Sequence, residues 1–130
     1  MDAAPEMLEL ARVRAPQATF IRADLLAWNP PRRFHTIFFA FWLSHIPPGS
    51  VATFWNTVAD ALLDGGRVVF VDEHVSAADH ETWLAEHIVQ RKLSDGSTYR
   101  IVKTFLDPQP VTDHLAELGW HADVHRIGTD

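Results

Sequence analysis

Two short, unbroken apolar runs constrain the fold of this chain more than any other feature. TIFFAFW occupies residues 36–42 and RVVFV occupies residues 67–71, and neither run alternates between apolar and polar positions. Such strands are typical of a parallel sheet that is covered by helices on both faces. Parallel neighbours need a crossover connection, so helices are expected between them. The chain is therefore predicted to be an α/β protein with a doubly wound, mostly parallel sheet.

Further helices and strands are predicted around these two runs. Apolar residues recur at helical spacing in four segments, at about 2–14, 51–62, 78–93 and 111–118. Shorter apolar segments at 18–22, 99–105 and 122–127 are expected to be strands. Asp95-Gly96 is expected to be a turn, and Gly65-Gly66 and Gly119 are expected to end helices.

Length and composition limit the classes of partner. The 130 residues suffice for one hydrophobic core, so a single domain over 1–130 is expected. No apolar run approaches the roughly 20 residues that cross a bilayer, and there is no cysteine, which together favour a cytoplasmic protein without a membrane partner. The formal net charge of -6 disfavours nucleic acid and favours a small molecule. A cationic cofactor would not be repelled.

Three segments with the character of strand ends carry a more specific pattern. The first is Asp2-Ala3-Ala4-Pro5-Glu6-Met7-Leu8, the second is Arg22-Ala23-Asp24-Leu25, and the third is Phe39-Ala40-Phe41-Trp42-Leu43-Ser44-His45. Leu63-Asp64-Gly65-Gly66-Arg67 and a strand that ends at Asp72 follow downstream. In this order and spacing, the segments resemble the class I S-adenosylmethionine-dependent methyltransferases of the small-molecule type. The similarity extends over essentially the whole chain.

The resemblance implies a Rossmann-like fold, S-adenosylmethionine as cofactor and methyl transfer to a small-molecule acceptor. It implies that Asp2 accepts hydrogen bonds from the ribose hydroxyls and that Asp24 accepts one from the adenine amino group. The Leu25 amide would donate to the adenine ring. Apart from the resemblance, His45 follows the strand that lines this site, which makes it the candidate general base. The remaining implied contacts are Ala3 and Met7 against the adenine, Ala23 beside them, and Phe41 and Trp42 along the methionine portion.

The chain departs from the family pattern at its beginning. Family members carry a first strand and a Gly-x-Gly-x-Gly loop before the position of Asp2, whereas the first glycine here is Gly49. The sequence is thus expected to lack the central strand of the sheet, and one strand of a terminal hairpin after Asp130. Unpaired strand edges would then have to pair elsewhere. A homo-oligomer or a rearranged sheet is predicted.

Each proposed site residue also has a simpler interpretation. Asp2 caps a helix equally well, and Asp24 fits an ordinary turn. His45 could cap the turn at Pro47-Pro48, and the polar triplet 72–74 could be solvated rather than bind metal or substrate. Phe38, Phe39 and Phe41 are expected in the core, and Trp42 is expected to face a pocket. The spacing of the eight histidines matches no zinc signature, so no metal site is predicted.

Two other functions remain open at this stage. One is a non-catalytic remnant of the methyltransferase fold that self-associates through its exposed sheet edge. The other is a nicotinamide-dependent enzyme, which would also place an acid at the end of the second strand. The segment around Asp24 and the Phe41-Trp42 pair favour methyl transfer over the nicotinamide alternative.

Overall fold

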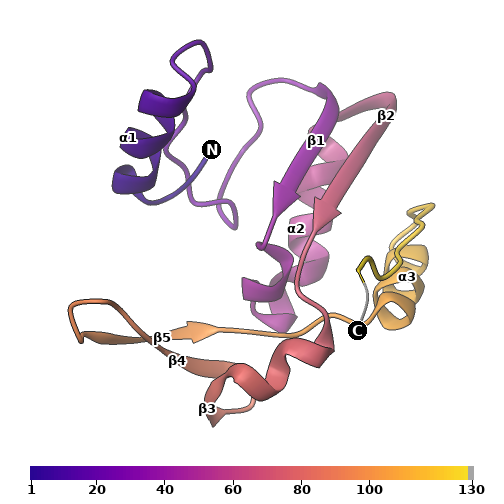
Figure 1. Ribbon diagram of the computed structural model, residues 1–130. Helices are drawn as coiled ribbons and strands as arrows, with labels where there is room; N and C mark the ends of the chain where they lie inside the picture. The colour runs from indigo at the N-terminus through magenta and orange to yellow at the C-terminus, as the bar shows by residue number, and fades with distance from the viewer. Residues whose placement is uncertain (129–130) are drawn as a thin grey trace.

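A parallel pair of strands lies at the centre of the computed structural model, which describes residues 1–128 (Figure 1). Strand β1 (Phe34–Ala40) pairs with β2 (Leu62–Val71), and helix α2 (Val51–Asp60) connects them. Both apolar runs therefore form the strands that the sequence predicts. Helix α1 (Pro5–Arg14) precedes this unit and α3 (Pro108–Glu117) follows it, so the predicted α/β class is confirmed.

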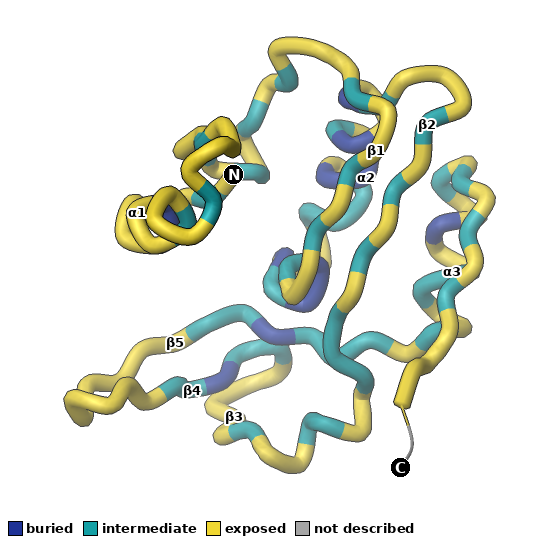
Figure 2. The backbone as a smooth tube through the Cα atoms, turned by 45° about the horizontal axis from the view of Figure 1, so that its top comes forward, coloured by how far each residue is buried: buried dark blue, intermediate teal, exposed yellow. Residues whose placement is uncertain are grey.

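The hydrophobic core lies on one face of this strand pair. Alternate side chains along β1 and β2 pack on this face, with Ile37 opposite Val68 and Phe39 opposite Phe70. Helices α2 and α3 supply the other half, and Figure 2 shows that buried residues concentrate along α2. Aromatic rings lie in edge contact within this core, as in the 5.3 Å between the ring centroids of Phe39 and Phe54. Such pairs add to the free energy of burial.

The opposite face of the strand pair is apolar but uncovered within residues 1–128. Phe38 lies opposite Val69 in the register, and the two are 64% and 47% exposed. Phe41 is 55% exposed. The expectation that these strands are buried on both faces, with Phe38 and Phe41 in the core, is therefore wrong for this part of the chain. The reason is that no described helix packs on this face.

A second sheet replaces the helix that was predicted over 78–93. A 3-10 helix (Val75–His80) leads into β3 (Thr82–Ala85), which pairs antiparallel with β4 (Ile88–Lys92), and β4 pairs with β5 (Thr98–Val102). The apolar residues of segment 78–93 fit both helical and strand spacing. The pairing of β4 with β5 favours the strands. Trp83 and Leu84, which the helix would have buried, are exposed, whereas Val89 is fully buried.

Of the glycines expected in turns or at helix ends, only the pair Gly65-Gly66 lies elsewhere. Gly96 adopts a φ of 88° in the β4–β5 turn, and Gly119 adopts a φ of 90° after α3, as predicted. Gly65-Gly66 does not end α2, because β2 already begins at Leu62 and the pair lies in an irregularity between the Phe34 and Thr36 pairings. Helix α2 begins without a side-chain cap, and the helix predicted over 78–93 does not form.

Two predicted strands do not form. Segment 18–22 makes a single parallel bridge, between Arg22 and Asp2. Segment 122–127 is extended but joins no sheet, although Val124 packs against the core. A strand needs a continuous neighbour, and neither segment has one in residues 1–128. The rearranged sheet that the sequence suggested is also not found there, because β1 pairs only with β2.

No helix within residues 1–128 combines the length and apolar character needed to span a membrane.

Candidate functional site

The three sequence segments of the family pattern meet around one hollow. Main-chain hydrogen bonds join the first two segments: the Asp2 N–H donates to the Ile21 carbonyl at 3.2 Å, and the Ala23 N–H donates to the Asp2 carbonyl at 3.0 Å. The third segment follows the end of β1. Between them lies a hollow of about 600 Å³. Its lining includes all of the predicted cofactor residues except Met7, namely Asp2, Ala3, Ala23, Asp24, Leu25, Phe41 and Trp42.

Two carboxylates at this hollow each keep one oxygen without a hydrogen-bond partner in residues 1–128. The Asp2 Oδ1 atom accepts from the Ala4 N–H at 2.9 Å, and the Asp24 Oδ1 atom accepts from the Leu26 N–H at 3.0 Å. Neither Oδ2 atom has a hydrogen-bond partner within residues 1–128. The Leu25 N–H likewise has no acceptor there. The site thus offers two anionic acceptors and a main-chain donor to a ligand.

The hydrogen bonds of Asp2 and Asp24 also show which of the simpler interpretations of these two acids holds. Asp2 is not the cap of α1, because the helix begins at Pro5 after Ala4 and has no side-chain cap. Asp2 instead closes a turn before the helix. Asp24 is a turn residue, as the simpler interpretation predicts, and it lines the hollow at the same time.

An aromatic wall closes the side of the hollow formed by β1. Phe41, directly after the strand, has a φ of 53°, a left-handed conformation that is unusual for a bulky side chain. Strain of this kind tends to occur at binding sites. Trp42 packs edge-on against Phe54 at 6.1 Å, and its indole N–H is buried without an acceptor in residues 1–128. Trp42 lines the hollow, so it faces a pocket as predicted.

Solved structures of other proteins are similar to this chain. The chain is similar to DhpI in a complex with SAH, with 35% identity and a TM-score of 0.77 over 89% of this chain and 53% of that one. It matches a DhpI-SAM-HEP complex with 36% identity, a TM-score of 0.76, and coverage of 88% and 55%. A methyltransferase from Clostridium acetobutylicum ATCC 824, 11% identical, gives a TM-score of 0.65 over 89% and 61%.

This chain carries part of the S-adenosylmethionine-dependent methyltransferase fold. The glycopeptide N-methyltransferase MtfA, 18% identical with a TM-score of 0.61, supports the same fold. The resemblance inferred from the sequence is thereby confirmed. The chain spans about half the length of the DhpI structures. No family model matches the chain, and no curated protein matches it.

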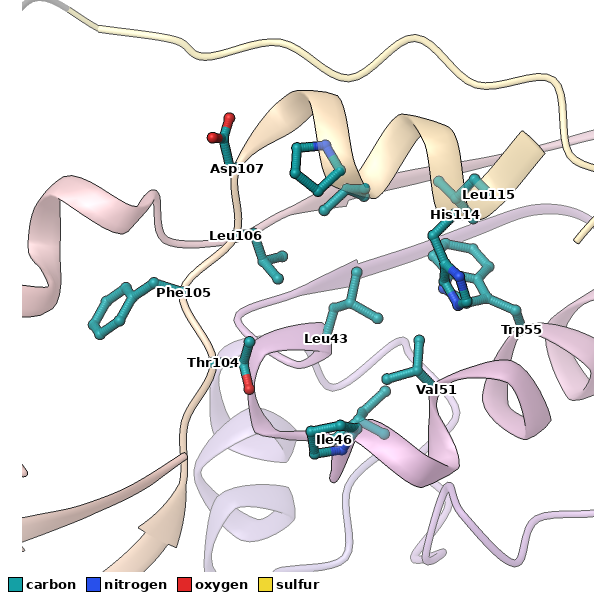
Figure 3. A pocket seen from close by; sticks show the side chains of 13 residues that line it. Leu43, Ile46, Val51, Trp55, Thr104, Phe105, Leu106, Asp107, His114 and Leu115 are labelled. Carbon is teal, nitrogen blue, oxygen red and sulfur yellow. The ribbon is translucent and has the colours of Figure 1, made fainter. Parts of the chain in front are cut away.

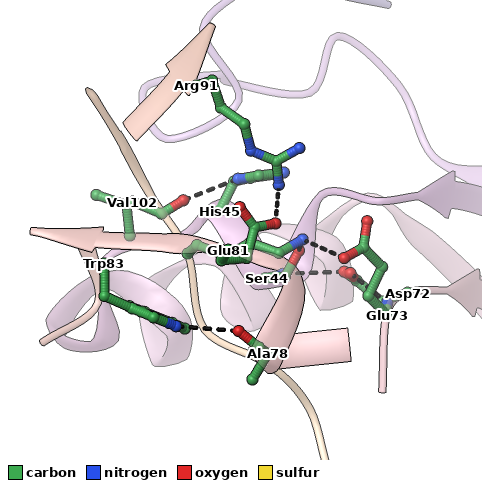
Figure 4. Close-up of polar contacts among 10 residues, drawn as sticks. Ser44, His45, Asp72, Glu73, Ala78, Glu81, Trp83, Arg91 and Val102 are labelled. Atoms are coloured by element: carbon green, nitrogen blue, oxygen red, sulfur yellow. Dashed lines mark hydrogen bonds and ion pairs between the residues drawn. The ribbon is translucent and has the colours of Figure 1, made fainter. Parts of the chain in front are cut away.

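His45 and Met7 lie outside the hollow of this methyltransferase fold. Met7 is 54% exposed on α1 and is not among the lining residues. The His45 Nδ1 atom lies 2.8 Å from the Val102 carbonyl oxygen (Figure 4). A carbonyl can only accept, so Nδ1 carries the proton and Nε2 keeps its lone pair in the neutral ring. His45 thus links the segment after β1 to β5 and does not cap the Pro47-Pro48 turn.

A buried polar network fixes the segment that carries His45. The Ser44 N–H donates to the Asp72 Oδ2 atom at 2.9 Å (Figure 4). The Lys103 Nζ atom lies 3.2 Å from both Ser44 Oγ and Glu73 Oε2. Asp72 and Glu73 are therefore bonded within the fold, and they are partly exposed rather than fully solvated strand-end residues. Lys103 was not predicted as a structural residue, although a lysine inside a predicted apolar strand was a usable signal.

Two other cavities contain none of the predicted cofactor residues. One, of about 360 Å³, lies between α2 and α3 and is walled mainly by aliphatic side chains such as Leu43, Ile46 and Leu115 (Figure 3). The other, of about 450 Å³, borders the outer side of β2. Within residues 1–128, no three His, Asp or Glu side chains come close enough together to hold a metal ion.

Proposed function

We propose that this chain binds S-adenosylmethionine in the 600 Å³ hollow and takes part in methyl transfer to a small-molecule acceptor. The observation that carries the proposal is that three segments, separate in sequence, bring their predicted ligand residues to one cavity. The similarity to DhpI supports it, because DhpI was crystallised with SAM and with SAH.

The free groups of the hollow fit an adenosine. The Oδ2 atom of Asp2 suits the vicinal hydroxyls of a ribose, since a carboxylate accepts from two donors. The free oxygen of Asp24 and the N–H of Leu25 form an acceptor and donor pair within one turn. Such a pair is complementary to the amino group and ring nitrogen of adenine. Ala3 and Ala23 leave room for the base because their side chains are small.

The proposed chemistry needs few side chains from the protein. S-adenosylmethionine, when bound, supplies an electrophilic methyl group on a sulfonium. The chain would hold the two reactants in line and exclude water, and positioning of this kind can account for much of a rate enhancement. Phe41 and Trp42 would lie along the methionine portion. His45 stays the proposed base, and because it lies outside the hollow, its Nε2 atom would act on an acceptor bound beside the hollow rather than within it.

A second candidate function is self-association without catalysis. The observation that favours it is the uncovered sheet face, where the exposed side chains of Phe38 and Val69 lie opposite each other beside the unpaired edge of β1. Apolar strand edges of this kind pair readily with another chain. Sedimentation velocity of the full chain, with and without S-adenosylmethionine, would reveal this behaviour.

Calorimetric titration with S-adenosylmethionine tests the first proposal. The wild-type chain should release or absorb heat with a one-to-one stoichiometry. Ala3→Phe fills the hollow from an exposed position and should weaken binding at least about tenfold, which is 1.4 kcal/mol. Ala116→Phe, the same change at an exposed position of α3, is the matched control and should bind like the wild type. No heat at millimolar ligand would favour self-association alone.

A further inference from the structure

We propose that Asp72 is a positioning residue for the hollow beside β1, although it is not one of the lining residues. Its carboxylate ties the segment after β1 to the end of β2, and this tie holds Phe41 and Trp42 where they line the hollow. The expected effect on ligand affinity rests on the proposed function, whereas the effect on the position of Trp42 is measurable without a ligand.

The Asp72 carboxylate uses both of its oxygens to join two parts of the chain. Asp72 directly follows β2, and its Oδ1 atom accepts from the Glu73 N–H at 2.8 Å. Its Oδ2 atom accepts from the Ser44 N–H at 2.9 Å (Figure 4). Hydrogen bonds to a charged acceptor are stronger than those between neutral groups. Because the first bond fixes the carboxylate at the end of its own strand, the second bond fixes Ser44 relative to β2.

Two successive residues at the end of β2 hold the segment after β1 at two points. The Phe41 N–H donates to the Val71 carbonyl at 2.8 Å, and the Ser44 N–H donates to Asp72. Phe41 and Trp42 both line the hollow, whereas Ser44 and Asp72 do not. Loss of the second point is therefore transmitted to the hollow through the main chain of this segment.

The segment after β1 needs this hold because local preference opposes the conformation that it adopts. Phe41 has a φ of 53°, in the left-handed region that bulky side chains disfavour. A residue keeps such a conformation only where its surroundings impose it. Without the bond from Ser44 to Asp72, Phe41 can return to a negative φ, and the direction of the Trp42 side chain then changes.

Ser44 has two other ties, and both run to the segment after β5. Its carbonyl accepts from the Thr104 N–H at 2.7 Å, and its Oγ atom accepts from Lys103 Nζ at 3.2 Å. With its N–H bonded to Asp72, this fully buried serine has all of its polar groups engaged. A substitution at Asp72 therefore releases the tie to β2 alone, and the buried contacts with the segment after β5 remain.

Two substitutions separate the position of the Asp72 oxygens from their charge. Asp72→Asn keeps the shape but replaces one acceptor oxygen by an amide NH2 group, so only one of the two N–H donors can stay bonded. Asp72→Glu keeps the charge but displaces both oxygens by one carbon. We expect both variants to weaken S-adenosylmethionine binding about three- to tenfold in calorimetric titrations, because a smaller fraction of molecules holds the aromatic wall in place.

Asp64→Asn and Asp64→Glu are the matched controls, because Asp64 is an exposed acid of β2 outside the lining. Both should bind S-adenosylmethionine like the wild type. If Asp72→Asn does not fold, the comparison of Asp72→Glu with Asp64→Glu decides.

The indole N–H signal of Trp42 in an NMR spectrum gives a readout that a loss of stability alone would not move. It is assigned by its disappearance in Trp42→Phe. Trp120, which packs against Trp55 in the core, provides an internal reference. In the ligand-free chain, both Asp72 variants should shift the Trp42 signal and leave the Trp120 signal in place.

Wild-type affinity in Asp72→Glu would show that charge rather than position matters, and would overturn the proposed role. An unshifted Trp42 signal in the Asp72 variants would overturn it as well. If the wild-type chain binds no S-adenosylmethionine, the proposed function fails, but a Trp42 signal that moves in both variants still supports the role of Asp72 in placing the aromatic wall.

Discussion

Replacing Lys103 by methionine removes a positive charge that is buried where the two sheets meet. The side chain of Lys103 is 1% exposed, and its Nζ atom contacts both Ser44 and Glu73 at 3.2 Å. It also lies 5.0 Å from the ring centroid of Phe105. Methionine keeps the apolar stem but forms none of these polar contacts, so the substitution isolates the contribution of the charge.

The magnitude follows from the surroundings of the two partners. Removing one member of a fully buried ion pair costs about 3–5 kcal/mol, because the other charge is left unpaired. Here the side chain of Glu73 is 35% exposed and can recover part of its hydration. The hydrogen bond to Ser44 is lost as well, and bonds to charged groups contribute about 1.5–3 kcal/mol. We expect Lys103→Met to lower the free energy of unfolding by about 2–3 kcal/mol.

Urea unfolding followed by circular dichroism measures this change. Lys92→Met is the matched control, since Lys92 is exposed on β4, and it should alter the free energy of unfolding by less than about 0.5 kcal/mol. Adding Glu73→Gln to Lys103→Met should restore at least half of the loss, because the unpaired carboxylate is removed. A Lys103→Met chain as stable as the control would refute the argument that this ion pair stabilises the junction.

Three further predictions concern the fold. Gly66→Ala would place a Cβ 2.8 Å from two carbonyl oxygens, so it should lower the melting temperature clearly, whereas Gly49→Ala meets open space and should not. Leu115→Ala empties a core position that is 2% exposed and should cost about 2–5 kcal/mol in urea unfolding. Hydrogen bonds from Ser97 hold the pKa of Asp95 below its ordinary value, so Ser97→Ala should raise that pKa in an NMR titration. An unchanged titration curve would contradict this cause.

The sequence predicts the centre of the fold well because its signals there are local. The runs at 36–42 and 67–71 combine β-branched and aromatic residues without polar interruption, and both form paired strands. The segment 78–93 is different, since its apolar spacing fits either a helix or a strand. Pairing of β4 with β5, which runs from Lys92 opposite Thr98 to Ile88 opposite Val102, selects the strands. Tertiary context of this kind is not visible in a single segment.

Some parts of the candidate site were likewise predictable from the sequence, and others were not. The meeting of Asp2, Asp24 and Trp42 at one hollow was predicted from the family resemblance, although in residues 1–128 only Trp42 follows a strand, and Asp2 lies in a single bridge with Arg22. The partners of His45 and Lys103 were not predictable. Their contacts depend on β5 and on the segment that follows it, and both were placed by the antiparallel sheet that the sequence analysis did not expect.

Chemical-shift mapping with S-adenosylmethionine tests the central claim most directly. A chain of 130 residues suits amide NMR, and each segment around the hollow contributes its own signals. The proposed site predicts that the largest shifts fall together on the amides of 2–3, 23–25 and 41–42. Shifts confined to the cavity between α2 and α3, or saturating ligand without any shift in these three segments, would contradict it.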